Sequence, residues 1–307
     1  MTEMQAANPF DLYQPEAYAR WREAKLATLP GRVDDLVVEV ADPRSLSRSE
    51  RQALLQLCAH SNMALYRSPR LGEDKDLARL IGAQLGLQRL DANWLADEDG
   101  ISPIAVSNTA GSRNDFIPYT DRAIGWHTDG YYHPDARRIE GMLLHCVRGA
   151  GEGGITGLAD PDMLYIALRD ANPAWVEALM AQDAMTIPER EDQHGVARPA
   201  QSGPVFCRRS DGGLHLRYTA RTRSIVWKPD ALTQQAVHFI EQVLASDPPW
   251  VFHLTLQAGM GLVSNNVLHR RSAFTDTPGQ PRLLYRARYL DCITPVPQDT
   301  AMEMASA

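Results

Sequence analysis

The sequence predicts a mainly β protein of the sandwich or jelly-roll class with flanking helices. Stretches with strand character recur through the second half, and only a few helical stretches interrupt them. This pattern does not have the regular strand–helix alternation of a parallel α/β sheet. No repeat or composition shift divides the 307 residues. We therefore expect one domain over 33–292, an N-terminal arm over 1–32 and a flexible tail over 293–307.

The first half supplies a capped helix and a long irregular segment. Ser47-Arg48-Ser49-Glu50 is a capping box, which predicts a helix to about residue 60. Residues 88–125 are rich in Asn, Asp, Ser and Gly, and long segments of this kind often act as lids over a site. Strands are expected over 34–40 and 63–66, and a second helix is expected over 74–85.

The second half supplies most of the strands. The apolar run over 139–147 is typical of a buried strand. Asn172-Pro173 is typical of a helix N-cap followed by proline at the first helical position. Helices are expected over 161–170 and 229–245. Further strands are expected over 184–187, 204–208, 214–219, 223–227, 250–256, 261–267 and 282–290.

Composition and charge exclude several classes of function. The formal net charge of −7 leaves no basic face for nucleic acid or an anionic membrane. The four cysteines form no C-x-x-C pair, which argues against a zinc ribbon and a disulfide framework. The first residues lack the pattern of a signal peptide, and no run of about 18 apolar residues could span a bilayer. We therefore expect a cytoplasmic protein with reduced thiols.

Two histidines and one aspartate indicate a metal site. His127 and Asp129 lie two residues apart, so an extended strand points both side chains to one face. Singly, such a triplet is more often a polar turn, and a lone histidine such as His269 is more often structural. Together they match two His and one carboxylate on one face of an octahedral metal, the site of non-haem Fe(II) oxygen chemistry. A carboxylate at 129 leaves no room for a halide, which favours hydroxylation or desaturation.

A pair of arginines near the C-terminus indicates an anion site. Arg282 and Arg286 lie four residues apart on a predicted strand and so face the same side. Their neighbours over 283–285 are apolar, which favours a partly buried face over a solvated basic edge. A buried arginine needs an anion, and a carboxylate co-substrate would supply it.

Two other classes of protein stay open. Residues 149–154 match G-x-G-x-x-G after a predicted strand, as in a nicotinamide-dependent oxidoreductase. Because Pro161 precedes the next helix, we favour a tight turn that presents Thr156. A non-catalytic, cupin-like metal-binding protein would use the histidines and Asp129 but would not require Arg282 or Thr156. No H-E-x-x-H or G-x-S-x-G motif indicates a zinc protease or a serine hydrolase.

Taken in order, these motifs resemble the taurine dioxygenase superfamily of Fe(II)- and 2-oxoglutarate-dependent dioxygenases. The resemblance runs across about 34–291 and is carried by the stretches 126–130, 153–156, 266–271 and 282–286. It implies a double-stranded β-helix core. It also implies His127, Asp129 and His269 as iron ligands, Thr156 and Arg282 as partners of the distal carboxylate of 2-oxoglutarate, and Arg286 as facing 2-oxoglutarate or the substrate.

Two branches of the superfamily share further stretches with this sequence. Residues 143–146 and 268–272 look like the γ-butyrobetaine and trimethyllysine hydroxylases, whereas 127–130 with 216–218 look like glutarate hydroxylase or clavaminate synthase. The sequence lacks the cysteine-rich zinc module of the γ-butyrobetaine enzymes. It also has Gly-Gly-Ile-Thr where the family has Gly-Gly-Asp-Thr or Gly-Gly-Asp-Ser. These departures concern the substrate and leave the iron ligands untouched.

The resemblance implies hydroxylation or desaturation of an unactivated C–H bond in a small metabolite, with O2 consumed and succinate and CO2 released. Aromatic residues near the metal motif would suit a quaternary ammonium group, and nearby arginines an anion. We favour a carboxylate-bearing metabolite, and the expected substrate contacts are Arg217, Trp126 and Asn108. Whether the chain forms a homo-oligomer stays open.

Overall fold

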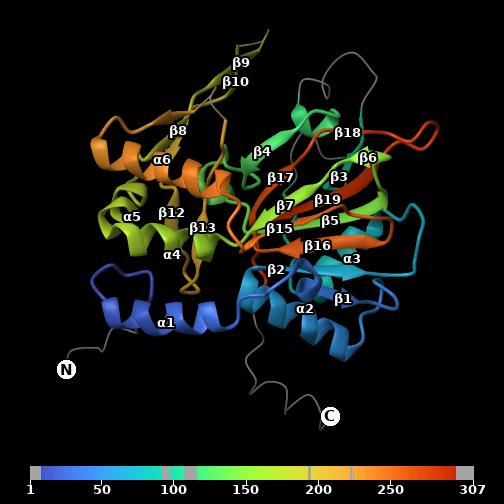
Figure 1. Ribbon diagram of the computed structural model, residues 1–307. Coiled ribbons are helices and arrows are strands. Elements are labelled where there is room, and N and C mark those ends of the chain that lie inside the picture. Colours follow the sequence, from blue (N-terminus) through green and yellow to red (C-terminus); the bar gives the residue numbers. More distant parts are fainter. Residues whose placement is uncertain are drawn as a thin grey trace.

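Two β-sheets form the centre of the protein. The computed structural model describes residues 8–91, 97, 99–106, 116–192, 195–221, 223 and 225–294. Within these ranges, a six-stranded sheet has the order β1-β2-β16-β5-β19-β3 and a four-stranded sheet the order β15-β7-β17-β4. Neighbours in each sheet come from distant parts of the chain, as the mixed colours of Figure 1 show. This is the mainly β architecture with flanking helices that the sequence predicts.

The large sheet is covered by helices on its outer face. It consists of β1 (Val37–Glu39), β2 (Met63–Arg67), β16 (Met260–Ser264), β5 (Gly141–Arg148), β19 (Leu283–Tyr289) and β3 (Ile101–Ile104). Successive side chains of a strand alternate between faces. Val263 accordingly packs with α2 (Arg48–Ser61) and α3 (Asp76–Gln84), while Leu262 faces the other sheet. The predicted capping box of α2 is confirmed, because Ser47 and Glu50 each accept the other's backbone N–H.

The small sheet carries the chemistry described below. It consists of β15 (Val251–Leu254), β7 (Thr156–Ala159), β17 (Leu268–Arg271) and β4 (Ile124–His127), all antiparallel. Its inner face packs on the large sheet through buried residues such as Leu158 and Phe252. Fully burying one such side chain contributes about 2 kcal/mol.

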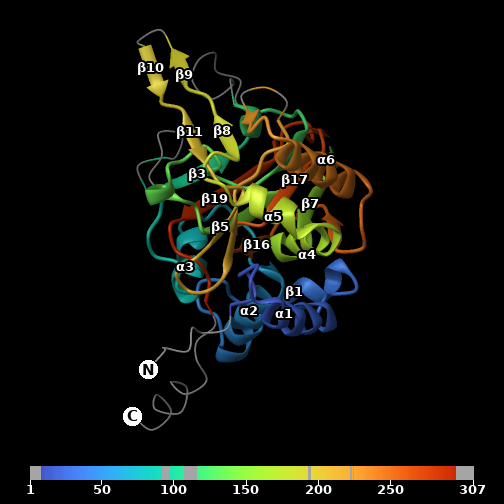
Figure 2. The same cartoon turned by 90° about the vertical axis from the view of Figure 1, so that its left-hand side faces the viewer.

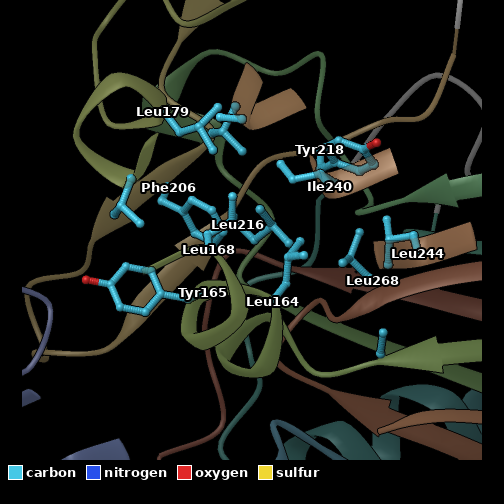
Figure 3. Close-up of a cluster of buried hydrophobic side chains, with 14 of the residues drawn as sticks. Leu164, Tyr165, Leu168, Leu179, Phe206, Leu216, Tyr218, Ile240, Leu244 and Leu268 are labelled. Carbon is cyan, nitrogen blue, oxygen red and sulfur yellow. The ribbon is translucent and has the colours of Figure 1, made fainter. Parts of the chain in front are cut away.

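A second apolar cluster covers the outer face of the small sheet. It joins α4 (Pro161–Ala171), α5 (Pro173–Leu179) and α6 (Ala231–Ala245) to the paired strands β12 (Phe206–Arg208) and β13 (Leu214–Leu216). Figure 3 shows Leu164, Phe206, Ile240 and Leu268 converging there. The predicted Asn172 cap of α5 is confirmed, since its side chain accepts the N–H of Ala174. The protein is thus layered as helices, sheet, sheet and helices.

The N-terminal arm contains one helix, α1 (Pro15–Ala27), which docks through a buried charge. Lys25 is 7% exposed, and its Nζ lies 2.6 Å from Asp160 Oδ2 and 2.7 Å from Asp162 Oδ2. A buried ammonium group without such partners would be strongly destabilising. This ion pair therefore ties the arm to the start of α4.

Several elements differ from the sequence-based expectation. The 88–125 segment contains β3, a 3-10 turn (Ile117–Tyr119) and the start of β4, so the described part is only partly irregular. The expected strand at 34–40 begins with a 3-10 turn, Val33–Leu36. Strand β17 was not predicted. Nor were three short strands, β9 (Arg190–Asp192), β10 (Gly195–Arg198) and β11 (Gln201–Gly203), the first two of which project from the body in Figure 2.

The glycine-rich stretch 149–154 connects strands and opens no helix. It runs from β5 through β6 (Glu152–Gly153) to β7, and the next helix, α4, begins at Pro161. A dinucleotide site would place these glycines at a helix N-terminus. The preferred interpretation, a turn that presents Thr156 on β7, is therefore the one observed. Within the described ranges, no helix is long and apolar enough to cross a bilayer.

Candidate active site

The predicted metal ligands meet at the edge of the small sheet. β17 pairs with β4 so that His269 lies directly opposite His127, and their ring centroids are 4.1 Å apart. Asp129 follows just after β4, with Oδ1 3.9 Å from His127 Nε2. Each of the three side chains offers a ligand atom, and these atoms all lie within 4.8 Å of one another. The antiparallel register thus joins two motifs that are far apart in the sequence.

Hydrogen bonds orient each ligand. His127 Nδ1 donates to the carbonyl of Gly125 and His269 Nδ1 to that of Val267, both at 2.9 Å. A carbonyl only accepts, so each Nδ1 carries the proton and each Nε2 is available to a metal. Gly130 follows Asp129 with φ +69°, and a β-carbon there would overlap Ile139, so only glycine suits this turn.

The donor set fits a divalent iron ion. Burial, and then the neighbouring His269, lower the pKa of His127 to about 3, so its imidazole is neutral near pH 7, as a metal ligand must be. Burial alone would raise the pKa of Asp129, but Arg286 and Arg288 hold it below its usual range. Asp129 Oδ2 is buried and has no hydrogen-bond partner among the described residues. A buried, unpaired carboxylate oxygen beside two neutral imidazoles calls for a cation.

A small cavity lies on one side of these ligands. It has a volume of about 60 Å³. It is lined by Thr156, Arg282 and Arg286, the residues expected to bind the co-substrate, and also by Arg271. Arg282 is 6% exposed, and no described carboxylate forms an ion pair with its guanidinium. Burial lowers its pKa. This cavity therefore suits a small carboxylate.

A large cavity of about 710 Å³ borders His127 and Asp129. Tyr119, Tyr131 and Tyr132 contribute aromatic rings to its wall, and Arg190, Arg198 and Arg221 contribute guanidinium groups. Residues 116–119, from the expected lid segment, also line it. Arg286 borders both cavities, and its Nη1 lies 3.3 Å from Asp129 Oδ1. Arg286 thus lies between the candidate metal ligands and the two cavities.

The three expected substrate contacts have different positions. Arg217 lines neither cavity, and its guanidinium donates to the carbonyls of Tyr131, Gln201, Gly203 and Met185. Backbone carbonyls occupy its donors, so this geometry offers no support for the expected contact between Arg217 and substrate, which stays a prediction. Trp126 contributes to the wall of the large cavity, while its indole stacks under Arg270 at 4.7 Å. Asn108 lies outside the described residues.

Sequence reasoning missed several residues that build the site. Asn266 accepts the backbone N–H of Asp129 and donates to the carbonyls of Asp129 and Ile139. Arg288 bonds Asp91 Oδ2 at 2.6 Å and the hydroxyl of Tyr132 at 2.9 Å beside the large cavity. Asn266 lies within the 266–271 stretch already singled out, and Arg288 lies two residues beyond Arg286, so the available signal was their place near a candidate ligand and an arginine pair.

Comparison with protein families and curated relatives extends these observations. The family model described as "Taurine catabolism dioxygenase TauD, TfdA family" matches residues 25–288. A uridine-5'-phosphate dioxygenase of Streptomyces sp is 34% identical over 203 residues, covering 62% of this chain and 70% of the relative. A uridine-5'-phosphate dioxygenase of Amycolatopsis sp is 31% identical over 172 residues, which cover 54% of this chain and 60% of the relative.

Solved structures share the fold at low sequence identity. The non-heme iron oxygenase OrfP in complex with Fe and alpha-ketoglutaric acid has a TM-score of 0.60 at 17% identity, covering 98% of this chain and 95% of that one. Asparagine oxygenase in complex with Fe(II), 2S,3S-3-hydroxyasparagine and succinate has a TM-score of 0.58 at 14% identity. The match covers 94% of this chain and 87% of that one. These likenesses confirm the predicted jelly-roll core.

Proposed function

The chain belongs to the taurine catabolism dioxygenase TauD, TfdA family and is an Fe(II)- and 2-oxoglutarate-dependent dioxygenase, and we propose that its substrate is a 5'-phosphorylated nucleoside. The family membership excludes the two alternatives, a metal-binding protein without turnover and a nicotinamide-dependent enzyme. In the reaction, one oxygen atom of O2 enters the substrate C–H bond, and the other enters succinate as 2-oxoglutarate loses CO2.

We assign the iron ligands to His127, Asp129 and His269. Fe(II) bound there would supply the O2 activation and C–H oxidation that side chains alone cannot perform. The chain's own contribution is to keep the two imidazoles neutral and Asp129 ionised. The hydrogen bonds to Gly125 and Val267 hold the rings in place.

We assign the distal carboxylate of 2-oxoglutarate to Thr156 and Arg282. The support is the position of both residues in the small cavity, which His127 and His269 also line. The guanidinium provides a charge-assisted hydrogen bond, and the hydroxyl a second, neutral one. Enclosure by apolar residues such as Leu144 and Leu284 keeps water from this end of the site.

The large cavity supports a nucleotide as the substrate. A volume of about 710 Å³ falls within the usual range for small-molecule sites. Tyr131 and Tyr132 offer faces on which a base could stack, and Arg198 and Arg221 offer charge to a phosphate. The sequence favours a carboxylate-bearing metabolite, but the two curated relatives act on a phosphate ester, so we propose phosphate as the anion.

Turnover with a defined panel of substrates tests this proposal. The protein is supplied with Fe(II), 2-oxoglutarate and O2, and succinate is measured with uridine-5'-phosphate, uridine or L-asparagine. We expect succinate and a product heavier by one oxygen, or the fragments formed from it, only with the phosphorylated nucleoside. Equal turnover with uridine would remove the role of the phosphate, and turnover with L-asparagine alone would refute the substrate class.

Variants in the cavity wall test the phosphate contacts. Arg198→Gln and Arg221→Gln should each raise the KM for uridine-5'-phosphate roughly tenfold, the effect of one lost charge-assisted hydrogen bond. Arg223→Gln is the matched control, because Arg223 is exposed and does not line the cavity. An unchanged KM in both cavity variants would move the phosphate site elsewhere.

A further inference from the structure

Arg271 connects the small cavity to the 116–123 segment. Its Nη2 donates to the carbonyls of Thr120 at 2.7 Å and Arg122 at 2.6 Å, and its Nη1 lies 3.5 Å from the carbonyl of Pro118. The N–H of Phe274 bonds the carbonyl of Asp121 at 3.0 Å. Four carbonyls of this segment are therefore held by β17 and the residues just after it. Both Nη atoms of the guanidinium are therefore engaged by backbone carbonyls.

One N–H of the same guanidinium, on Nε, has no partner among the described residues. Arg271 is 7% exposed, and its Nε is buried without a hydrogen bond among the described residues. Arg271 lies opposite Thr156 in the register of β17 and β7, and both line the small cavity. A buried N–H without a partner is costly, so an acceptor that enters the cavity is favoured.

A second guanidinium makes the need for an anion stronger. The Cζ atoms of Arg271 and Arg282 lie 4.7 Å and 5.1 Å from the centroid of the same Phe274 ring. Two like charges share one enclosed site, and a carboxylate there would relieve the repulsion between them.

We propose that Arg271 is a positioning residue through which 2-oxoglutarate organises the 116–123 segment. The inference rests on the proposed function, because it takes the anion of the small cavity to be the distal carboxylate of that co-substrate. When the cavity is filled, the carboxylate fixes the guanidinium from inside. The fixed guanidinium then holds the carbonyls of Pro118, Thr120 and Arg122 from outside.

The consequence reaches the large cavity. Residues 116–119 line its wall, and Pro118 and Ile124 border both cavities. Filling the small cavity therefore shapes the surface that the substrate meets. Coupling of this kind is reciprocal, so substrate should also tighten the binding of 2-oxoglutarate.

Hydrogen exchange of the 116–123 amides tests the proposal without turnover. The protein is loaded with Mn(II) under anaerobic conditions, and exchange is followed with and without saturating 2-oxoglutarate. Calorimetry gives the Kd of 2-oxoglutarate for the same samples. The variants are Arg271→Gln, which removes the charge, and Arg271→Lys, which keeps the charge but lacks the planar fork that reaches several acceptors.

Arg169→Gln is a matched control. Arg169 is also a buried arginine that holds a chain segment by its carbonyls, those of Pro9 and Asp11, but it lies on α4 and lines neither cavity. Its replacement should loosen the N-terminal arm. It should leave the Kd of 2-oxoglutarate and the exchange of 116–123 unchanged.

We expect 2-oxoglutarate to slow exchange in 116–123 about tenfold in the unaltered protein. Arg271→Gln should raise the Kd about tenfold and abolish the slowing at saturation, and Arg271→Lys should abolish the slowing with a smaller change in Kd. If Arg271→Gln does not fold, the unaltered protein and the lysine variant still decide the matter. Binding of 2-oxoglutarate without slowed exchange, or an unchanged Kd in Arg271→Gln, would overturn the inference alone. Absence of 2-oxoglutarate binding by the unaltered protein would overturn the proposed function and the inference together.

Discussion

Replacing Asn266 with alanine should weaken both the fold and the metal site. Its side chain makes three buried hydrogen bonds, one from the N–H of Asp129 and two to the carbonyls of Asp129 and Ile139. Each buried group left without a partner costs at least about 1 kcal/mol, or about 3 kcal/mol together. Asn266 has φ +50°, a conformation in which alanine is disfavoured by about 1 kcal/mol more.

We therefore expect Asn266→Ala to lower the free energy of unfolding by about 4 kcal/mol, measured by urea denaturation of the metal-free protein. Because Asn266 holds the backbone of a metal ligand, the affinity for Fe(II) or Mn(II) should fall about 10- to 100-fold. Compared with Asn266→Ala, Asn266→Gly should regain about 1 kcal/mol of the free energy of unfolding, because glycine tolerates the positive φ. Its metal affinity should remain low, because the side-chain hydrogen bonds are still missing.

Asn265→Ala is the control for this experiment. Asn265 also bonds backbone groups, the N–H and carbonyl of Ile293, but it does not touch Asp129. Its loss should reduce stability and leave the metal affinity unchanged. The reasoning is refuted if Asn266→Ala binds metal as tightly as the unaltered protein, or if Asn265→Ala loses metal affinity to the same extent.

Three further outcomes are expected. Asp129→Ala should reduce Mn(II) affinity by more than about 100-fold in an anaerobic titration, because a direct ligand is lost rather than an outer partner. Arg282→Ala should raise the Kd of 2-oxoglutarate about 10- to 100-fold with unchanged metal affinity, since one charged partner of the carboxylate is removed. Burial lowers the pKa of His145 to about 4, and its Nδ1 lies 2.8 Å from the hydroxyl of Tyr66. Below about pH 6.5 the unfolded chain therefore binds a proton on His145 that the folded protein does not bind. Up to about 3 kcal/mol of the free energy of unfolding should be lost between about pH 6.5 and 4. Urea unfolding across this range should show a shallower pH dependence for His145→Gln.

The grouping of the three candidate metal ligands was predictable because its signal is local. His127 and Asp129 share one face of a short strand, and His269 carries its own flanking motif, so each half is visible before the strands pair. The register that sets His269 opposite His127 was not visible, because pairing is decided by contacts between distant segments. Strand β17 was missed for a related reason: Leu268-His269-Arg270-Arg271 contains one apolar residue and has no strand pattern of its own.

The arginines show where sequence reasoning fails. Arg217 and Arg271 are both buried and both donate to backbone carbonyls, yet only Arg271 borders a cavity. Residue type and neighbours do not distinguish a guanidinium that supports the wall from one that faces a ligand. The difference depends on which carbonyls surround each side chain, and these come from segments far away in the chain.

The edge of the small sheet should also influence how long a metal ion remains bound. β4 is the terminal strand of that sheet, and residues 218–220 cover its free side. The N–H of Thr128 donates to the carbonyl of Tyr218, and the N–H of Ala220 donates to the carbonyl of Trp126. A covered edge is protected from pairing with other chains. Tyr218 and Thr219 are buried, and Tyr218 packs in the same apolar cluster as Leu268, so the cover should open only when this part of the core loosens. A metal ion held by His127 and Asp129 should therefore dissociate slowly, and its residence time should shorten with substitutions that loosen the packing of Tyr218.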